Sequence, residues 1–368
     1  MFVVAVNVQA SMPKVADSEG WFDRLERPLR ELRVSVTDRC NLRCRYCMPR
    51  EHFGANHNFV PREQILNFEE ITRVVRILHK VGLRKVRLTG GEPLLREELN
   101  VLVRMLKAIP NLEVALTTNG ILLPRHARAL KAAGLDRITL SLDALDEAVF
   151  QRITDSQFAP RDVLRALDAA VAAGFTSLKI NCVIKRGVND NQILPMVDHF
   201  RHTPHELRFI EFMDTGETTA WAFSDVVTAN EILSRVQEQF AVEPIFETEY
   251  GQTSRMYRHR TGPGRVGVIA SVSSPFCGNC TRARLTAKGE IYTCLFGTTA
   301  LDVRRLLRSE HSDTDILEAL HATWSAREDQ YSELRGAKPT TANDAPTVPV
   351  SRLIGGQKGR PEMSYLGG

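Results

Sequence analysis

Six of the seven cysteines in this 368-residue chain fall into two groups of three. The first group has the spacing C-x3-C-x2-C and consists of Cys40, Cys44 and Cys47. The second has the spacing C-x2-C-x13-C and consists of Cys277, Cys280 and Cys294. Closed zinc and iron–sulfur sites usually take four protein ligands, so each group lacks one. A four-iron cube held by three thiolates leaves one iron open to another ligand, and the sequence therefore favours two such clusters.

Disulfides and zinc are the alternative explanations of the two groups. Disulfides are unusual in a large chain without a secretion signal. Zinc would need a fourth ligand, for which His52 and His57 lie near the first group and His259 lies upstream of the second. The seventh cysteine, Cys182, lies in the hydrophobic run S-L-K-I-N-C-V-I and is interpreted as a small buried hydrophobe.

The composition is that of a globular protein, with 43% hydrophobic and 25% charged residues. A net charge of +4 favours a small anionic ligand over a nucleic-acid surface, because no block of Lys and Arg is present. No apolar run reaches the ~18–20 residues that a membrane span needs, and the N-terminus lacks the basic start of a signal peptide. We therefore expect a cytoplasmic protein that binds neither membrane nor nucleic acid.

Short β-rich runs alternate with helical periodicity from residue 31 to about 240. The predicted strands cover residues 32–36, 85–89, 113–117, 137–142, 178–184 and 207–212. Such alternation predicts an α/β fold with a parallel sheet and helices outside it. Six units are too few for a closed eight-fold barrel, so we expect an incomplete, open six-unit β/α barrel of the triosephosphate isomerase type. Its sites should lie at the carboxyl ends of the strands, where Cys40, residues 90–93 and residues 118–120 are found.

Capping signals mark the helices between these strands. Asn67 with Glu70, and Thr228 with Glu231, have the spacing of capping boxes, and Gly82, Gly134 and Gly174 suit helix ends. The domain organisation we expect is an N-terminal extension (1–21), the barrel (22–245), a C-terminal region with the second cysteine group (246–335), and a linker with a Gly-Gly tail (336–368).

Three further motifs accompany the cysteines. Tyr46 precedes the third cysteine, L-T-G-G-E-P occupies 88–93, and C-x2-C-T-R-A-R is followed by a terminal Gly-Gly. With these motifs the chain from about residue 22 onward resembles the GTP 3′,8-cyclase family (molybdenum cofactor biosynthesis protein A) of the radical S-adenosylmethionine (SAM) superfamily. The resemblance implies an incomplete barrel, two oxygen-sensitive [4Fe–4S] clusters and a homodimer.

The resemblance also implies the reaction and the residues that bind SAM. Reduction of SAM at the first cluster gives a 5′-deoxyadenosyl radical, which removes the 3′ hydrogen of GTP. The C3′ radical then adds to guanine C8 and yields 3′,8-cyclo-7,8-dihydro-GTP. The first cluster would be held by Cys40, Cys44 and Cys47, and SAM by Tyr46, Gly91, Ser141 and Met213.

The second cluster, on Cys277, Cys280 and Cys294, would face the guanine. Guanidinium groups match phosphate geometry, and the implied substrate contacts are Arg33, Lys85, Arg87, Thr118, Lys179, Arg282 and Arg284. Gly367 and Gly368 have two interpretations: a flexible chain end, or, by resemblance, a catalytic tail that enters the active site.

The partners that the resemblance implies are GTP, a second copy of the chain, a reductase or flavodoxin-type electron donor, and the downstream cyclic pyranopterin monophosphate synthase. Two alternatives stay open. A radical SAM enzyme with an auxiliary cluster could act on a peptide, although such enzymes commonly carry longer C-terminal cysteine sets. A metal-stabilised nucleic-acid-binding protein would instead contain zinc and show basic or aromatic stripes.

Overall fold

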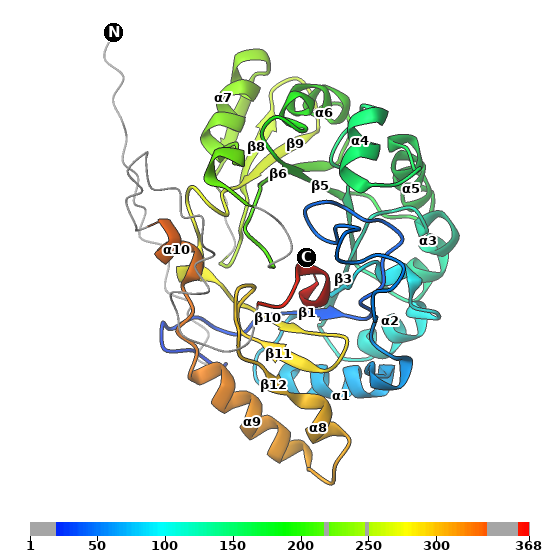
Figure 1. Ribbon diagram of the computed structural model, residues 1–368, viewed down its shortest axis with the longest axis vertical. Helices are drawn as coiled ribbons and strands as arrows, with labels where there is room; N and C mark the ends of the chain where they lie inside the picture. The colour runs from blue at the N-terminus through cyan, green and yellow to red at the C-terminus, as the bar shows by residue number, and fades with distance from the viewer. Residues whose placement is uncertain (1–19, 217–220, 247–249, 337–359, 368) are drawn as a thin grey trace.

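The computed structural model describes residues 20–216, 221–246, 250–336 and 360–367. In these residues twelve strands form one sheet in the order β12-β11-β10-β1-β2-β3-β4-β5-β6-β9-β8-β7. Eight neighbouring strands, from β10 to β9 in this order, are mutually parallel. Figure 1 shows them curling around a central space with helices outside, and the barrel does not close.

The six predicted strands are confirmed to within one residue at each end. They are β1 (Glu31–Ser35), β2 (Lys85–Thr89), β3 (Glu113–Thr118), β4 (Arg137–Ser141), β5 (Lys179–Ile184) and β6 (Glu206–Glu211). Two later strands extend the parallel part beyond six: β9 (Arg265–Ile269) pairs with β6, and β10 (Arg282–Leu285) pairs with β1. The antiparallel edges are β7 (Val242–Ile245), β8 (Arg255–His259), β11 (Glu290–Tyr292) and β12 (Leu301–Asp302).

The helices that cover the parallel strands are α1 (Phe68–His79), α2 (Leu99–Lys107), α3 (Leu123–Ala132), α4 (Glu147–Thr154), α5 (Pro160–Ala172), α6 (Ile193–Phe200) and α7 (Ala229–Gln239). The C-terminal region adds α8 (Val303–Leu307), α9 (Asp313–Ser325), α10 (Tyr331–Gly336) and α11 (Met363–Leu366). No helix in the described ranges combines the length and apolarity needed to cross a membrane.

Local signals account for the helix ends. Asn67 and Glu70 form the predicted capping box of α1. At α7 only half of the predicted box forms, because Thr228 accepts from the Glu231 backbone while the Glu231 carboxylate pairs with Arg186. The three predicted helix-ending glycines, Gly82, Gly134 and Gly174, all have positive φ.

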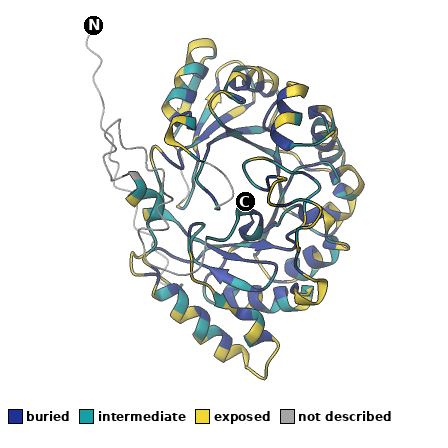
Figure 2. Cartoon of the chain, viewed as in Figure 1, coloured by how far each residue is buried: buried dark blue, intermediate teal, exposed yellow. Residues whose placement is uncertain are grey.

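Alternation along each strand separates the core from the barrel interior. In β1, Leu32 and Val34 are fully buried and belong to the core beneath the helices, whereas Glu31 and Arg33 point the other way. Figure 2 shows the same division, with buried residues between sheet and helices and exposed residues on the outer helix faces. Polar residues at alternate positions therefore line the interior.

The segment 270–281 joins the two ends of the parallel run. It begins at the carboxyl end of β9 and ends at the amino end of β10. These two strands are the first and last of the eight parallel strands. The segment therefore spans the opening of the barrel, and it carries Cys277 and Cys280. The sheet continues through residue 245, and the division into domains at that position stays a prediction.

Candidate active site

The two cysteine groups lie at opposite ends of the same strands. Cys40 follows the carboxyl end of β1, as predicted. The carbonyl of Thr281, next to Cys280, accepts hydrogen bonds from the backbone N–H groups of Arg30 (3.0 Å) and Glu31 (3.1 Å), at the amino end of β1. Four steps along this five-residue strand span about 13 Å. The barrel interior therefore connects the two groups over a distance that suits a small molecule.

The first group sits in a tight loop. The backbone N–H groups of Cys47 and Met48 both donate to the Cys44 carbonyl, at 2.9 and 2.8 Å. Burial raises the pKa of Cys47 to about 12 and also that of Cys44, and in each the neighbouring Cys40 thiolate adds to the shift. Three half-buried thiols that repel each other when ionised need a cation to hold them as thiolates.

Gly91 is required by the packing of this loop. Its backbone N–H donates to the Thr37 carbonyl (2.8 Å), and the Glu92 N–H donates to the Arg39 carbonyl (2.8 Å). A Cβ at Gly91 would lie 2.3 Å from the Arg39 carbonyl oxygen. Any side chain at this position would therefore displace the backbone that leads into Cys40.

The other predicted SAM residues also lie at the carboxyl ends of strands. The Tyr46 hydroxyl donates to Asp143 Oδ2 (2.7 Å), and Asp143 Oδ1 accepts from the Val183 N–H (2.8 Å). Burial raises the pKa of Asp143 to about 6. Ser141 is the last residue of β4, and Met213 follows β6 by two residues. Ser141 and Met213 thus lie at the same edge of the sheet as Cys40, and their contact with SAM stays a prediction. Asp143 is a support for Tyr46 that the motif did not reveal.

The second group has a cationic environment. Arg282 Nη2 donates to Cys280 Sγ (3.4 Å), and the Phe296 N–H donates to Cys294 Sγ (3.5 Å). Burial would raise the pKa of Cys280, but the charges of Arg282 and Arg327 outweigh it and lower the pKa to about 6. Burial raises the pKa of Cys277 and raises that of Cys294 to about 11, so the arginines favour the metal-binding thiolate form at Cys280 alone.

The surroundings of the two groups bear on the disulfide and zinc alternatives. All seven cysteines are free, which removes the disulfide alternative. Within the described ranges no three Cys, His, Asp or Glu side chains converge enough to hold one metal ion. The histidines considered for zinc do not supply a fourth ligand. His57 bonds the Tyr365 hydroxyl (3.0 Å) and the His52 carbonyl (3.1 Å), and His259 packs against Phe240.

Half-buried and buried cations line the interior between the two groups. In the strand register Arg33 lies beside Arg87 and Arg284, and Glu31 lies beside Lys85 and Arg282. Glu31 Oε1 is 3.2 Å from Arg87 Nε and 3.5 Å from Arg33 Nε. Burial alone would raise the pKa of Glu31, but the surrounding cations hold it far below its ordinary range. Burial also lowers the pKa of Arg33 to about 10. This excess of positive charge favours a polyanionic ligand.

The cationic layer continues on β5 and β6. Burial lowers the pKa of Lys179 to about 8, and the nearby Arg208 adds to the shift. Arg208 pairs with Glu206 and is itself nearly enclosed. The sequence interpretation did not include Arg208, although its position two residues after Glu206 in E-L-R-F-I-E (206–211) places both on the same face of β6.

Thr118 lies apart from these cations. Its hydroxyl donates to Glu92 Oε1 (2.7 Å) and accepts from the Gly120 N–H (3.0 Å). The threonines that face the arginines are Thr117 and Thr139, whose hydroxyls accept from Arg87 Nη1 at 3.3 and 3.2 Å. The structure therefore brings six of the seven predicted substrate residues into one interior layer and leaves Thr118 beneath the first cysteine group.

The described part of the C-terminal tail, residues 360–367, lies within the barrel ring in Figure 1. Arg284 Nη1 donates to the carbonyls of Gly367 (2.6 Å) and Leu366 (3.1 Å). Gly367 has φ +70°, and a Cβ there would lie 1.9 Å from Thr89 Oγ1. Glycine is therefore required at this position. Gly368 lies outside the described residues.

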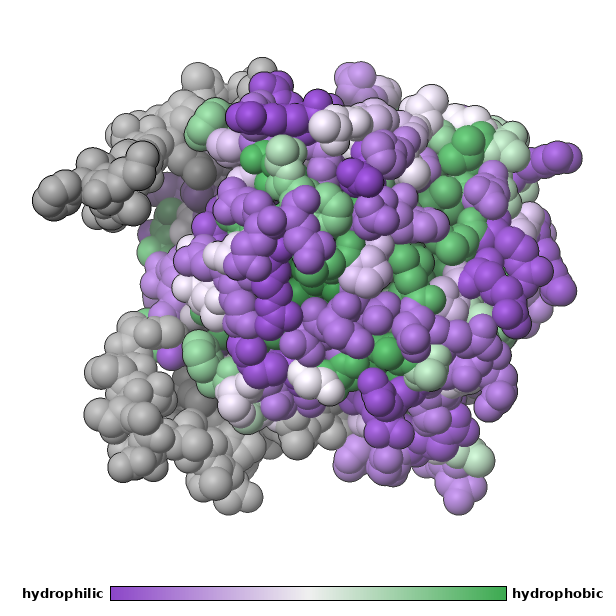
Figure 3. All heavy atoms as spheres, turned by 90° about the horizontal axis from the view of Figure 1, so that it is seen from above, coloured by the Kyte–Doolittle hydropathy of each residue, from purple (hydrophilic) through white to green (hydrophobic). Residues whose placement is uncertain are grey.

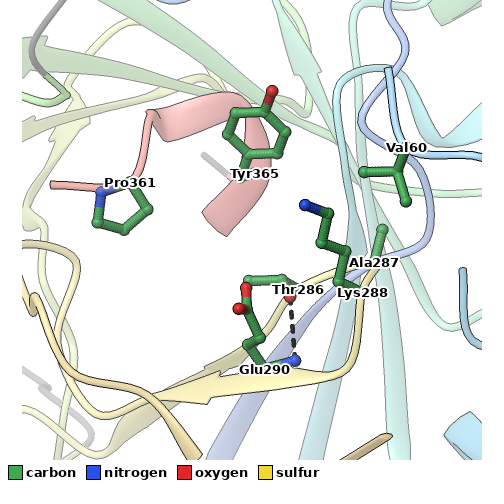
Figure 4. Close-up of a pocket in the computed structure, with 7 residues that line it drawn as sticks. All are labelled: Val60, Thr286, Ala287, Lys288, Glu290, Pro361 and Tyr365. Atoms are coloured by element: carbon green, nitrogen blue, oxygen red, sulfur yellow. Dashed lines mark hydrogen bonds between the residues drawn. The ribbon is translucent and has the colours of Figure 1, made fainter. Parts of the chain in front are cut away.

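The tail leaves a small pocket beside the β10–β11 turn. Figure 4 shows Pro361 and Tyr365 of the tail on one side of it and Lys288 and Glu290 on the other. The volume is ≈ 140 Å³, too small for a nucleotide. The substrate space predicted from the cations is thus distinct from this pocket.

Comparisons with known proteins agree with this geometry. Residues 34–200 match the radical SAM superfamily, and residues 205–333 match the family described as Molybdenum Cofactor Synthesis C. Proteins named GTP 3′,8-cyclase from Acidothermus cellulolyticus and Staphylococcus epidermidis are 46% and 44% identical to this chain. Each comparison covers 94% of this chain and 98% of the relative.

The fold also recurs in a solved structure. The crystal structure of Streptococcus suis SuiB bound to S-adenosylmethionine superposes with a TM-score of 0.57 at 15% identity, over 86% of this chain and 69% of that one. At this identity the likeness concerns the fold alone, and it confirms the open α/β barrel. With the near full-length relatives above, the chain belongs to the GTP 3′,8-cyclase family of radical SAM enzymes.

Proposed function

We propose that this chain uses SAM and two [4Fe–4S] clusters to cyclise GTP to 3′,8-cyclo-7,8-dihydro-GTP for molybdenum cofactor biosynthesis. The observation that carries the proposal is the buried cationic layer, which lies inside the barrel between two cysteine groups at its opposite ends. A triphosphate held there would keep its nucleoside between the two groups.

The first group, Cys40, Cys44 and Cys47, would hold the cluster that binds SAM. Once bound, that cluster supplies the electron that converts SAM to the 5′-deoxyadenosyl radical needed to remove the 3′ hydrogen of GTP. The contribution of the protein is to position SAM relative to the substrate. Gly91 permits the close approach of the loops around the site, Tyr46 is oriented by Asp143, and Ser141 and Met213 border the same space. Because a primary carbon radical attacks what lies nearest, held geometry is the main catalytic contribution.

The second group, Cys277, Cys280 and Cys294, would hold a second cluster that offers an additional binding position to the substrate. The triphosphate would be neutralised by interior cations: Arg33, Lys85, Arg87, Lys179, Arg208, Arg282 and Arg284. Arg284 also donates to the tail carbonyls, so it would couple substrate binding to the position of Gly367. Glu31 keeps Arg33 and Arg87 in place while leaving the layer net positive. Thr118 would act indirectly, through Glu92 and the loop near Cys40.

The family resemblance supports the remaining expectations. These are a homodimer, a flavodoxin-type or reductase electron donor, and transfer of the product to cyclic pyranopterin monophosphate synthase. Oxygen-sensitive clusters and free ligand thiols suit the reducing cytoplasm. The basic residues that carry the argument face the interior, and the surface in Figure 3 is mostly hydrophilic with apolar residues interspersed. These features favour a small polyanion over nucleic acid or a peptide.

Anaerobic reconstitution tests the proposal. The chain should take up about eight irons, from two four-iron clusters. With SAM, a strong reductant and GTP it should form 5′-deoxyadenosine and a cyclised guanosine product, and ATP should give no cyclised product. Eight irons and deoxyadenosine without a GTP product would refute the substrate. Zinc without iron would refute the proposal altogether.

Two substitutions test the substrate layer. Arg282→Ala and Arg284→Ala each remove a charged donor, for which a loss of ~1.5–3 kcal/mol is expected, or about 10- to 150-fold weaker GTP binding. Equilibrium binding of GTP measures this, with SAM binding as the control that should stay unchanged in both variants. Iron content should stay unchanged in Arg284→Ala, and Arg282→Ala is compared at equal iron loading because Arg282 also contacts Cys280 Sγ. Loss of iron in Arg284→Ala would show that this arginine supports the cluster instead.

A further inference from the structure

Three buried charged residues form one ion-pair cluster at the amino end of the barrel: Asp23, Arg27 and Arg327. Their side chains are 0%, 0% and 1% exposed. Asp23 Oδ2 is 2.6 Å from Arg27 Nε and 3.3 Å from Arg327 Nη1, and Asp23 Oδ1 accepts from the Arg27 backbone N–H (2.9 Å). Fully buried charges are costly to desolvate, and removing one partner leaves the others uncompensated. None of these residues takes part in the substrate layer described above.

The two arginines extend from this cluster to the second cysteine group. Arg27 Nη1 donates to the Cys277 carbonyl at 2.9 Å, and Arg327 Nη1 donates to the Cys280 carbonyl at 2.8 Å. Each guanidinium therefore fixes the backbone of a different cysteine. A segment near residue 25 and another near residue 327, far apart in the sequence, thus meet at the loop that crosses the barrel opening.

The third cysteine is connected through Asp329. Arg27 Nη1 also donates to the Asp329 carbonyl (2.8 Å), and the Thr293 hydroxyl donates to Asp329 Oδ2 (2.6 Å). Thr293 immediately precedes Cys294. Cys277 and Cys280 are thus tied directly to the ion-pair cluster, and Cys294 is tied to it through Asp329 and Thr293.

One guanidinium nitrogen of the ion-pair cluster has no partner. Across the part of the chain that the structure describes, Arg27 Nη2 is buried without a hydrogen-bond partner, whereas Arg327 Nε has an ion-pair partner in Asp329 Oδ2 at 3.6 Å. Buried N–H groups are ordinarily paired, so the unpaired donor of Arg27 points to an anionic group beside this loop. Hydrogen bonds and charge around an iron–sulfur cluster also set its reduction potential.

We propose that Asp23, Arg27 and Arg327 are positioning residues of the second iron–sulfur cluster. The guanidiniums hold the ligand loop through the Cys277 and Cys280 carbonyls, Asp23 fixes both guanidiniums, and their positive charge stabilises the reduced cluster. This inference rests on the proposed function, because it requires a cluster on Cys277, Cys280 and Cys294.

The experiment isolates the second site in the full-length chain. Cys40, Cys44 and Cys47 are changed to Ala, so that iron taken up on anaerobic reconstitution reports the second group alone. In this background Arg27→Gln and Arg327→Gln remove the charge, and Arg327→Lys retains it. Arg24→Gln is the matched control. Arg24 is next to Asp23 and its ion-pair partner Glu328 is next to Arg327 in the sequence, but the side chains of Arg24 and Glu328 are largely exposed.

The reference protein should hold about four irons per chain. The Gln variants should lose iron to a chelator about 10- to 100-fold more readily, as is typical when a supporting residue of a metal site is removed. Their remaining cluster should have a more negative reduction potential in an electron paramagnetic resonance titration, and Arg327→Lys should restore most of the potential. Arg24→Gln should match the reference in both measurements.

The outcomes separate this inference from the proposed function. If the reference takes up no iron, the second cluster itself fails and the inference fails with it. If the reference binds iron but the Gln variants behave like Arg24→Gln, only the inference is overturned. The mirror background, with Cys277, Cys280 and Cys294 changed to Ala, controls for folding. Loss of first-group iron there in the same Gln variants would show a general folding role and would also overturn the inference.

Discussion

Gly367→Ala should remove the tail from the barrel interior. Gly367 has φ +70°, a conformation that costs an L-residue about 1–2 kcal/mol. The new Cβ would also lie 1.9 Å from Thr89 Oγ1 and 2.9 Å from Thr89 Cβ. Thr89 is buried and its hydroxyl donates to the Val34 carbonyl (3.2 Å), so it cannot move aside freely.

The magnitude follows from these two contributions. Overpacking at a buried contact costs about 1–3 kcal/mol. With the backbone strain the docked tail is destabilised by about 2–5 kcal/mol, which reduces its population by about 30-fold to a few thousand-fold. The hydrogen bonds from Arg284 to the carbonyls of Leu366 and Gly367 would be lost with it.

The assay has two measurements. The rate of cyclised product at saturating GTP and SAM should fall in proportion to the docked fraction, and hydrogen exchange at residues 363–367 should accelerate. Gly187→Ala is the control, since Gly187 has nearly the same φ, +69°, but a Cβ there meets nothing within 4 Å. It should destabilise the fold slightly and leave turnover unchanged. Equal turnover in the two variants would refute the steric reasoning and show that the tail position does not matter for catalysis.

Three further outcomes are expected. Burial depresses the pKa of Lys179 to about 8 in the folded chain, from 10.5, so the folded protein holds fewer protons across that window. The free energy of unfolding should therefore increase as pH rises from about 8 to 10.5, whereas the KM for GTP should rise above pH 8 because Lys179 loses its charge. Lys179→Arg should flatten the dependence of KM on pH. An unchanged dependence in this variant would contradict the role of Lys179 in binding GTP. Cys182→Ala should leave the iron count of the reconstituted protein unchanged, because Cys182 is fully buried in the core away from both groups; a lower count would make it a ligand. Asn67→Ala removes the N-cap of α1 and should lower the free energy of unfolding by ~1 kcal/mol in urea titrations without affecting turnover, and a loss of turnover would show that α1 does more than cover the sheet.

Local patterns in the sequence were sufficient for the cysteine groups, the six barrel strands and the helix ends. Strand alternation, capping residues and glycines at helix ends act over a few residues, so they can be recognised without knowing the fold. Alternation along β1, β2 and β5 is by itself enough to place Arg33, Arg87 and Lys179 on one face of the sheet. Thr118 is implied only by the family resemblance, and in the structure its hydroxyl donates to Glu92.

The tertiary structure decided how distant segments meet. No local signal shows that β9 and β10 continue the parallel sheet from its two ends, so that the loop between them carries Cys277 and Cys280 to the end opposite Cys40. Arg208, Asp143 and the cluster of Asp23, Arg27 and Arg327 likewise acquire meaning only through partners far away in the chain. The pairing of strand edges and the burial of charges depend on contacts between distant parts of the chain. The type and spacing of the cysteine ligands depend only on a few adjacent residues.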